Sequence, residues 1–149
     1  MKPEWVLKPF NDLSVHELYA ILQLRTEVFV VEQQCVFQDM DDKDQSSLHL
    51  CAWLNGKAVA GTRLVPPGLA YPEPSIGRVV TSSAVRGLKL GRELMERSIT
   101  ACFEAFGKQN IQIGAQQYLH RFYGSLGFEQ TGEPYLEDGI WHIHMLLHV

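Results

Sequence analysis

A basic, glycine-containing segment at Ser83–Leu94 (SAVRGLKLGREL) has the composition and position of an anion-binding turn. It follows a run typical of a strand and begins a run typical of a helix, whose first turn has free backbone N–H groups and a partial positive charge. Arg86, Lys89 and Arg92 add three cations at three-residue spacing. A bound phosphate would offset their repulsion with the helix dipole. The alternative is a solvated basic face, and the segment alone leaves both interpretations open.

Two arginines in apolar surroundings are candidate substrate contacts. Arg25 lies within the apolar stripe of a predicted helix, where a buried arginine usually has a carboxylate partner. Glu32, seven residues later, could be that partner. Arg78 can pair with an acidic residue or meet an acidic group of a substrate, and Arg63 invites the same two interpretations.

Three histidines could act as bases or ligands. His49 begins a predicted strand and could act as a base through water, although a single strand histidine is more often structural. His142 and His144 form an H-x-H pair on one face of a predicted strand. Two ligands without a nearby cysteine or carboxylate set are weak evidence for a metal, so no metal site is expected.

The composition indicates a globular chain of 149 residues, with 46% hydrophobic and 20% charged residues. A net charge of −4 and a pI of about 5.8 argue against a nucleic-acid partner. The Walker and dinucleotide-binding motifs are absent. The widely spaced Cys35, Cys51 and Cys102 are typical of free thiols in a reducing compartment. No signal peptide or membrane-spanning run is evident, so we expect a cytoplasmic protein without a membrane partner.

Strands and helices alternate along the chain. Ser14 and Glu17 have capping-box spacing before a first predicted helix that ends near residues 31–34. The acidic and polar residues 38–47 predict an exposed loop, and Asn55-Gly56 predicts a hairpin turn. The last two strands are expected to join near Glu137-Asp138-Gly139. Further helices are predicted from about Leu88 to Phe106 and over 117–126, and the strands flanking the 88–106 helix should be parallel. The strands are expected at residues 4–10, 48–54, 58–65, 75–82, 110–116, 128–135 and 139–148.

Two motifs resemble those of the GNAT acetyltransferase superfamily. Arg86–Gly91 (RGLKLG) resembles its [RQ]-x-x-G-x-[GA] signature, with Lys89 in place of the middle glycine, and Arg121–Phe128 resembles its F/L-Y-x-x-x-G-F motif. The ElaA-type branch is a closer match, over residues 23–33, 76–80, 113–116 and 137–145. The resemblance implies one acetyltransferase domain over residues 1–149. Its α/β fold would have a central mixed parallel and antiparallel sheet of six to seven strands flanked by helices.

The resemblance also implies acetyl-CoA as the acyl-donor cosubstrate. The backbone of residues 79–81 would bind the pantetheine arm like an added strand, and amides around residues 87–92 would bind the pyrophosphate. Separation of this strand from the one at 111–115 would make room for the donor. Lys89 is expected to have helical backbone angles, with its side chain pointing outward or toward phosphate. The expected cofactor-binding residues are Val79, Val80, Thr81, Arg86, Gly87, Leu88, Lys89, Leu90, Gly91, Arg92 and Gln116.

Acetyl transfer requires loss of a proton from the amine, stabilisation of the thioester oxygen and a proton donor for the leaving thiolate. By the resemblance, Tyr123 is the expected donor, and a backbone N–H near Val80 would stabilise the oxygen. Glu32 and His142 are expected on the acceptor side as base or substrate contacts. Alternatively, Tyr123 packs as a core aromatic and Glu32 is a surface or ion-paired carboxylate. The candidate substrate-binding residues are Arg25, His49 and Arg78.

The expected function is acetyl transfer from acetyl-CoA to a primary amine of a small molecule or peptide, by direct attack in a ternary complex. A non-catalytic acyl-CoA-binding regulatory module on the same fold is an alternative, favoured by the altered loop and opposed by Tyr123. Acyl-homoserine-lactone synthesis is a weaker alternative, because only Arg25–Phe29 resembles the related synthases of that reaction and the chain is short. Dimers are common in the superfamily, so a homodimer is compatible, but no residue identifies an interface.

Overall fold

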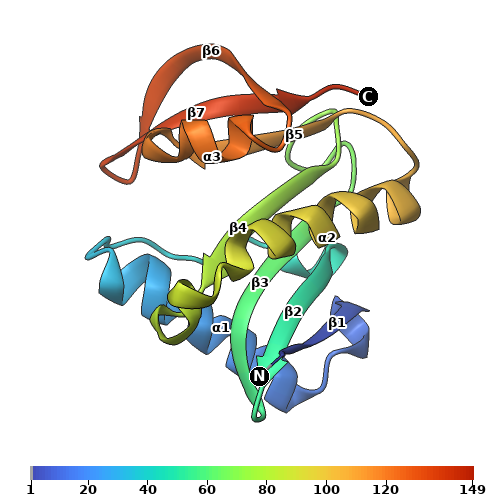
Figure 1. The fold of residues 1–149 in the computed structure, drawn as a ribbon, viewed down its shortest axis with the longest axis vertical. Coiled ribbons are helices and arrows are strands. Elements are labelled where there is room, and N and C mark those ends of the chain that lie inside the picture. The colour runs from blue at the N-terminus through green and yellow to red at the C-terminus, as the bar shows by residue number, and fades with distance from the viewer. Residues whose placement is uncertain (1) are drawn as a thin grey trace.

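The computed structural model describes residues 2–149, and its strands form a seven-stranded mixed sheet (Figure 1). The strand order is β1-β2-β3-β4-β5-β7-β6. Only β4 and β5 are parallel among the paired strands of residues 2–149, as predicted for the strands that flank the 88–106 helix. The expected α/β fold is therefore confirmed. The strands are β1 (Glu4–Pro9), β2 (Leu48–Leu54), β3 (Lys57–Val65), β4 (Ser75–Thr81), β5 (Ile111–Gln116), β6 (Phe128–Glu137) and β7 (Ile140–Leu147).

Helices cover both faces of the sheet. The helices are α1 (Val15–Arg25), α2 (Leu90–Phe106) and α3 (His120–Gly124). Neighbouring residues of β3 show the two faces, because Ala58 packs against a core cluster that contains Leu24 of α1, whereas Val59 belongs to a cluster that contains Leu94 of α2. Figure 1 shows α2 crossing β3 and β4, while α3 lies beside β5, β7 and β6 at the other end of the sheet. No helix within residues 2–149 is long and apolar enough to cross a membrane.

Three short segments, one helix start and two hairpin turns, have the structures that their local sequences predict. Ser14 Oγ accepts the Glu17 N–H at 3.0 Å and Glu17 Oε1 accepts the Ser14 N–H at 2.8 Å, which completes the capping box of α1. Asn55-Gly56 joins β2 to β3, and Asp138-Gly139 joins β6 to β7. All four turn residues have positive φ, as a type I′ hairpin turn requires.

The end of the first helical region differs from the prediction. The sequence predicts one helix ending near residues 31–34, but α1 ends at Arg25 and a π-helical segment follows over Thr26–Glu32. Its wider turn is seen where the Gln33 N–H donates to the Val28 carbonyl at 3.1 Å. An apolar pattern read at 3.6 residues per turn does not distinguish this geometry from an α-helix. The segment places Phe29 and Glu32 in the lining of the cleft described below.

The start of α2 also differs. Residues Ser83–Leu88 form a 3₁₀ helix, and α2 begins at Leu90. Lys89, between the two, has φ +57° and ψ +35°, so the expected helical backbone at this residue is wrong. The chain turns sharply between the two helices, and the left-handed conformation makes that turn. This explains why glycine suits the middle position of the signature, and it leaves Lys89 with about 1 kcal/mol of backbone strain.

Candidate acyl-CoA cleft

Strands β4 and β5 are registered at their start and then separate. Ser75–Gln112 is the only registered pair between them in the described part of the chain. The register of β4 against β3 shifts between Gly61 and Arg63, where Arg78 of β4 has φ +50°. Such a bulge bends a strand. The separated strands border a cleft of about 820 Å³.

The cleft brings together most of the predicted site residues. The predicted residues in its lining are Glu32, Arg78, Val79, Val80, Thr81, Arg86, Gly91, Gln116, Tyr123 and His142. The predicted residues outside the lining are Arg25, His49, Gly87, Leu88, Lys89, Leu90 and Arg92. The basic turn therefore reaches the cleft through Arg86 and Gly91 near its two ends.

The start of α2 at the cleft is open. Lys89 makes no side-chain capping bond to the helix, so its first backbone N–H groups have no side-chain acceptor there. A Cβ on Gly91 would meet only Phe122 Cζ at 4.0 Å, and one on Gly87 would meet nothing within 4 Å. Packing within the protein thus does not require either glycine. The open space and free N–H groups could accommodate an anion.

Glu32 and Arg86 form an ion pair at the cleft. Arg86 Nη2 lies 2.6 Å from Glu32 Oε2, and Arg86 Nη1 donates to the other carboxylate oxygen. Arg86 Nη2 also donates to the Thr81 carbonyl at 3.0 Å. The hydrogen bond from Arg86 lowers the pKa of the Glu32 carboxyl, which makes it a weaker base. One of the alternatives predicted from the sequence was that Glu32 is ion-paired. The structure shows such a pair, but the partner is Arg86 rather than Arg25.

Tyr123 lies in a wall of the cleft. Its side chain is 5% exposed, and its ring packs edge-on against Phe122 at 5.1 Å and Phe128 at 6.1 Å between centroids. Burial raises the pKa of the phenol well above its ordinary value. The hydroxyl therefore stays protonated and can donate a hydrogen bond. Tyr123 therefore both packs as a core aromatic and lines the cleft.

His142 presents one ring nitrogen as an acceptor. Nδ1 lies 2.8 Å from the carbonyl oxygen of Ile140. A carbonyl only accepts, so Nδ1 carries the proton and Nε2 has the lone pair in the neutral ring. Glu137 Oε2 lies 3.7 Å from Nε2, where it would stabilise the ring once Nε2 takes a proton. The ring can therefore act as a base at Nε2.

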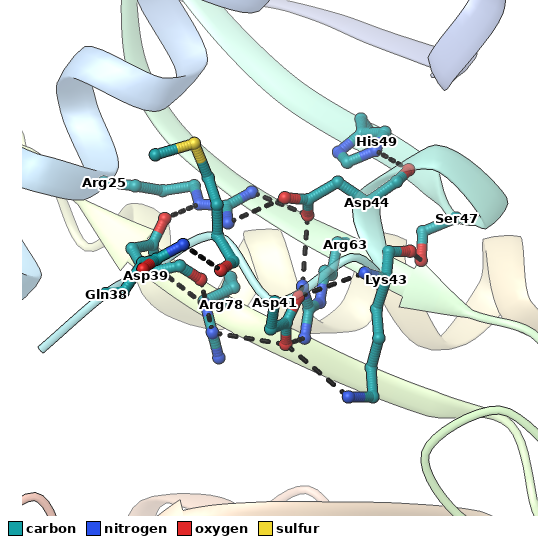
Figure 2. A network of polar contacts seen from close by, with 11 residues as sticks. Arg25, Gln38, Asp39, Asp41, Lys43, Asp44, Ser47, His49, Arg63 and Arg78 are labelled. Carbon is teal, nitrogen blue, oxygen red and sulfur yellow. Dashed lines mark hydrogen bonds and ion pairs between the residues drawn. The ribbon is translucent and has the colours of Figure 1, made fainter.

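Arg25 and His49 belong to a buried polar network beside the cleft (Figure 2). Arg25 is 2% exposed and donates to Asp39 at 2.7 Å and to both oxygens of Asp44 at 2.9 and 3.1 Å. His49 is 3% exposed, and its Nε2 lies 2.9 Å from the Asp44 carbonyl oxygen. Neither side chain offers surface to an acceptor. We therefore do not retain either in the proposed acceptor site.

Two further arginines complete this network. Arg63 forms two bonds of 2.6 Å to Asp41, and Arg78 Nε donates to Asp39 at 2.8 Å while Nη2 donates to its carbonyl at 2.7 Å. Figure 2 shows the loop that carries Asp39, Asp41 and Asp44 lying against the strands that carry these two arginines. Arg78 therefore satisfies the ion-pair expectation while also lining the cleft. The arginine–aspartate cluster comprises Arg25, Arg63, Arg78, Asp39, Asp41 and Asp44.

The sequence predicts that residues 38–47 form an exposed polar loop, and this is wrong for several of them. Asp39, Asp44 and Ser47 are buried. A run of acidic residues usually indicates a solvated loop, and only arginines far away in the sequence make its burial favourable. A partner for Arg25 was foreseen from its apolar surroundings, but no local spacing identifies which carboxylate it is.

Two hydrogen bonds bridge the other side of the cleft. Gln116 Nε2 of β5 donates to Gln33 Oε1 at 3.2 Å, just after the π-helical segment. Cys35 Sγ donates to the Asp138 carbonyl at 3.3 Å, in the turn between β6 and β7. All four residues line the cleft. The end of the first helical region is thus held against the C-terminal strands.

Comparison with known families agrees with this geometry. A family described as an acetyltransferase (GNAT) domain matches residues 10–149. The chain belongs to the GNAT acetyltransferase family. ElaA of Escherichia coli K12 is 42% identical over 144 residues, which cover 95% of this chain and 94% of that protein. The resemblance to the ElaA-type branch is therefore confirmed.

Solved structures of the GNAT fold superpose closely on the chain. An acyl-CoA N-acyltransferase from Pseudomonas aeruginosa has a TM-score of 0.93 and 45% identity, covering 97% of this chain and 99% of that one. Escherichia coli ElaA has a TM-score of 0.91 and 40% identity, covering 98% and 99%. A CoA-dependent acyl-homoserine lactone synthase, BjaI, has a TM-score of 0.76 at 19% identity, with coverage of 99% and 82%. That last likeness concerns the fold alone.

Proposed function

We propose that this GNAT-family chain transfers the acetyl group of acetyl-CoA to a primary amine of a small molecule or peptide, by direct attack in a ternary complex. The cleft between β4 and β5 is the observation that carries the proposal, because one space is lined by Gly91 of α2, the β4 backbone, Tyr123 and His142. The description of the Pseudomonas aeruginosa structure as an acyl-CoA N-acyltransferase supports an acyl-CoA donor.

The groups around the cleft fit acetyl-CoA. Beyond Ser75, β4 has no registered partner in β5, so backbone groups of Val79–Thr81 that face away from β3 are available to the pantetheine amides. The open first turn of α2 would bind the pyrophosphate through its N–H groups. A backbone N–H near Val80 would donate to the thioester oxygen as negative charge develops on it.

The proposed reaction uses two side chains of the cleft. The amine nitrogen bonds to the thioester carbonyl carbon, and the carbon–sulfur bond breaks. His142 Nε2 takes the proton of the amine, while the paired Glu32 is the weaker candidate base. The Tyr123 hydroxyl gives its proton to the leaving sulfur and recovers one from water. In water a phenol is a weaker acid than a thiol by about 1.5 pKa units, and burial disfavours both anions, so breaking of the carbon–sulfur bond must drive this slightly unfavourable proton transfer.

The cysteines favour direct transfer over an acyl-enzyme. Only the thiolate is a good nucleophile, and burial raises the pKa of Cys51 and of Cys102 to about 12. Neither of these two lines the cleft. Cys35 lines it but is buried, and its thiol donates to the Asp138 carbonyl.

Acetyl-CoA binding and amine-dependent release of CoA test the proposal. We expect acetyl-CoA to raise the unfolding temperature of the protein and free thiol to appear when an amine from a panel is added. Binding without thiol release for any amine would favour the non-catalytic module. Absence of any protection by acetyl-CoA or CoA would contradict both functions.

A further inference from the structure

We infer that the phenol hydroxyls of Tyr71 and Tyr135 form a subsite for a neutral oxygen atom of the acceptor, close to the amine that is acetylated. The inference rests on the proposed function and adds a substrate class to it, namely amines that carry a nearby carbonyl or hydroxyl oxygen. The two tyrosines come from distant segments, because Tyr71 lies in the loop between β3 and β4 and Tyr135 lies in β6.

The two hydroxyls converge over one residue of the cleft, Gly114 of β5. A Cβ on Gly114 would lie 2.9 Å from the Tyr135 oxygen and 3.0 Å from the Tyr71 oxygen, which is closer than real Cβ atoms approach. Gly114 has no positive φ, so its backbone angles do not demand glycine. Space for the two hydroxyls is therefore the reason for a glycine in the Ile113–Gln116 segment.

Neither hydroxyl has a hydrogen-bond partner among residues 2–149, although both tyrosines are partly buried. The fully buried side-chain atoms without partners in the same residues are Arg63 Nε and Glu73 Oε1, so both phenol oxygens remain reachable from solvent. A phenol whose ring is packed and whose hydroxyl is free normally bonds to water or to a ligand. Two such donors at one point provide a binding position for an oxygen.

Aromatic contacts hold both rings in place beside the candidate base. Tyr135 stacks on His144 at 4.6 Å and on His142 at 5.7 Å between centroids. Tyr71 packs edge-on against His144 at 5.6 Å. Gln116, His142 and Tyr135 are register partners across β5, β7 and β6. An acceptor amine at His142 would therefore have its neighbouring atoms near the two hydroxyls.

The electrostatics favour a neutral oxygen over a carboxylate. Burial raises the pKa of Tyr135 to about 12 and that of Tyr71 above its ordinary value, and the charge of Glu137 acts in the same direction on both. Both phenols therefore stay protonated and donate. The same Glu137 charge would repel an anionic ligand. A hydroxyl or carboxamide oxygen fits this position better.

A panel of four small amines tests the subsite. Ethanolamine and glycinamide carry a neutral oxygen, ethylamine carries none and glycine carries a carboxylate. In Tyr71→Phe and Tyr135→Phe, we expect kcat/KM for ethanolamine and glycinamide to fall about fivefold to tenfold, the effect of one neutral hydrogen bond, and that for ethylamine to change less than about twofold. Each amine is compared between enzymes, so differences in amine basicity cancel. Tyr19→Phe, at an exposed position of α1, is the matched control.

Gly114→Ala gives a second, independent variant. Its methyl group should displace both hydroxyls and produce the same selective loss, and the loss should be smaller when Tyr135→Phe is already present. Equal losses for amines with and without an oxygen would overturn the subsite and leave the tyrosines a packing role. A larger loss for glycine than for glycinamide in the two tyrosine variants would also overturn it.

Calorimetric titration separates failure of the subsite from failure of the proposed function. If no amine releases CoA, the proposed function fails, and glycinamide and ethylamine are titrated into the CoA-bound protein. Tighter binding of glycinamide that is lost in Tyr71→Phe and Tyr135→Phe supports the subsite without turnover. The same affinity for both amines, or for all variants, contradicts it.

Discussion

Glu32 and Arg86 form a two-pronged ion pair at the cleft although 54 residues separate them in the sequence. The pair joins the end of the π-helical segment to the 3₁₀ turn before α2. Arg86 also binds the Thr81 carbonyl, so one guanidinium links three parts of the cleft wall. Glu32 is therefore better explained as a residue that positions Arg86 and its 3₁₀ turn than as a base.

Glu32→Gln should weaken acetyl-CoA binding more than it slows the chemical step. The amide keeps the shape of the carboxylate but loses the charge that holds Arg86, so we expect a Kd for acetyl-CoA about twofold to fivefold higher, as for loss of an exposed ion pair. The acid limb of the pH–rate profile should not move. Glu93→Gln, which breaks an exposed pair with Arg97 on α2, is the control. A fall in kcat of about a hundredfold with unchanged Kd would restore Glu32 as the base.

Replacement of Lys89 should reveal its left-handed backbone. Glycine adopts this conformation freely and alanine does not, so Lys89→Gly should exceed Lys89→Ala in free energy of unfolding by about 1 kcal/mol. Urea denaturation of the two variants measures the difference. Equal stabilities would indicate a helical backbone at this position.

His142→Gln should lower kcat and leave acetyl-CoA binding unchanged. Loss of a general base typically lowers the rate by about a hundredfold to ten-thousandfold. His148→Gln, at an exposed position near the C-terminus, is the control. A normal kcat in His142→Gln would exclude the histidine as the base.

The arginine–aspartate cluster should make stability fall in acid. Burial opposes ionisation of Asp41 and Asp44, but hydrogen bonds and charges of Arg63 and Arg25 outweigh it and hold the pKa of both carboxyls below its usual range. A folded pKa below the unfolded value of about 4 gives stability that is present above that pH and is lost as pH falls through the folded values.

Asp41→Asn should therefore flatten the dependence of the unfolding free energy on pH below about 4, relative to the wild type. Urea denaturation at a series of pH values measures this slope. Asp12→Asn, in the short 3₁₀ turn before α1, is the control. An unchanged slope in Asp41→Asn would contradict the ionic role of Asp41.

Local signals in the sequence predict most of the helices, strands and turns of the fold. The capping box at Ser14 and the turns at Asn55-Gly56 and Asp138-Gly139 act over a few residues, so their spacing predicts the structure directly. The motif at Arg86–Gly91 likewise places a helix start beside a strand end. The backbone angles of Lys89 were missed because an ordinary side chain at that position gives no sign of a positive φ.

Contacts between distant segments set most of what the sequence did not reveal. Neither the pairing of Glu32 with Arg86 nor the burial of Asp39 and Asp44 has a local pattern, because each depends on strands and helices that meet only in the fold. Tyr71 lies in a proline-rich loop, where no local spacing indicates a binding residue. The Ile113–Gln116 segment was recognised as a motif, but the reason for its glycine lies in tyrosines from two other elements.

The most direct test of acetyl transfer by this protein is the mass of the amine product in parallel reactions of wild type and Tyr123→Phe with acetyl-CoA. We expect the amine to gain one acetyl group with the wild type. We also expect Tyr123→Phe to bind acetyl-CoA with similar affinity but to form the product at least about tenfold more slowly, because the leaving sulfur lacks its proton donor. Binding of acetyl-CoA with no acetylated amine, or equal product rates from the two proteins, would contradict it.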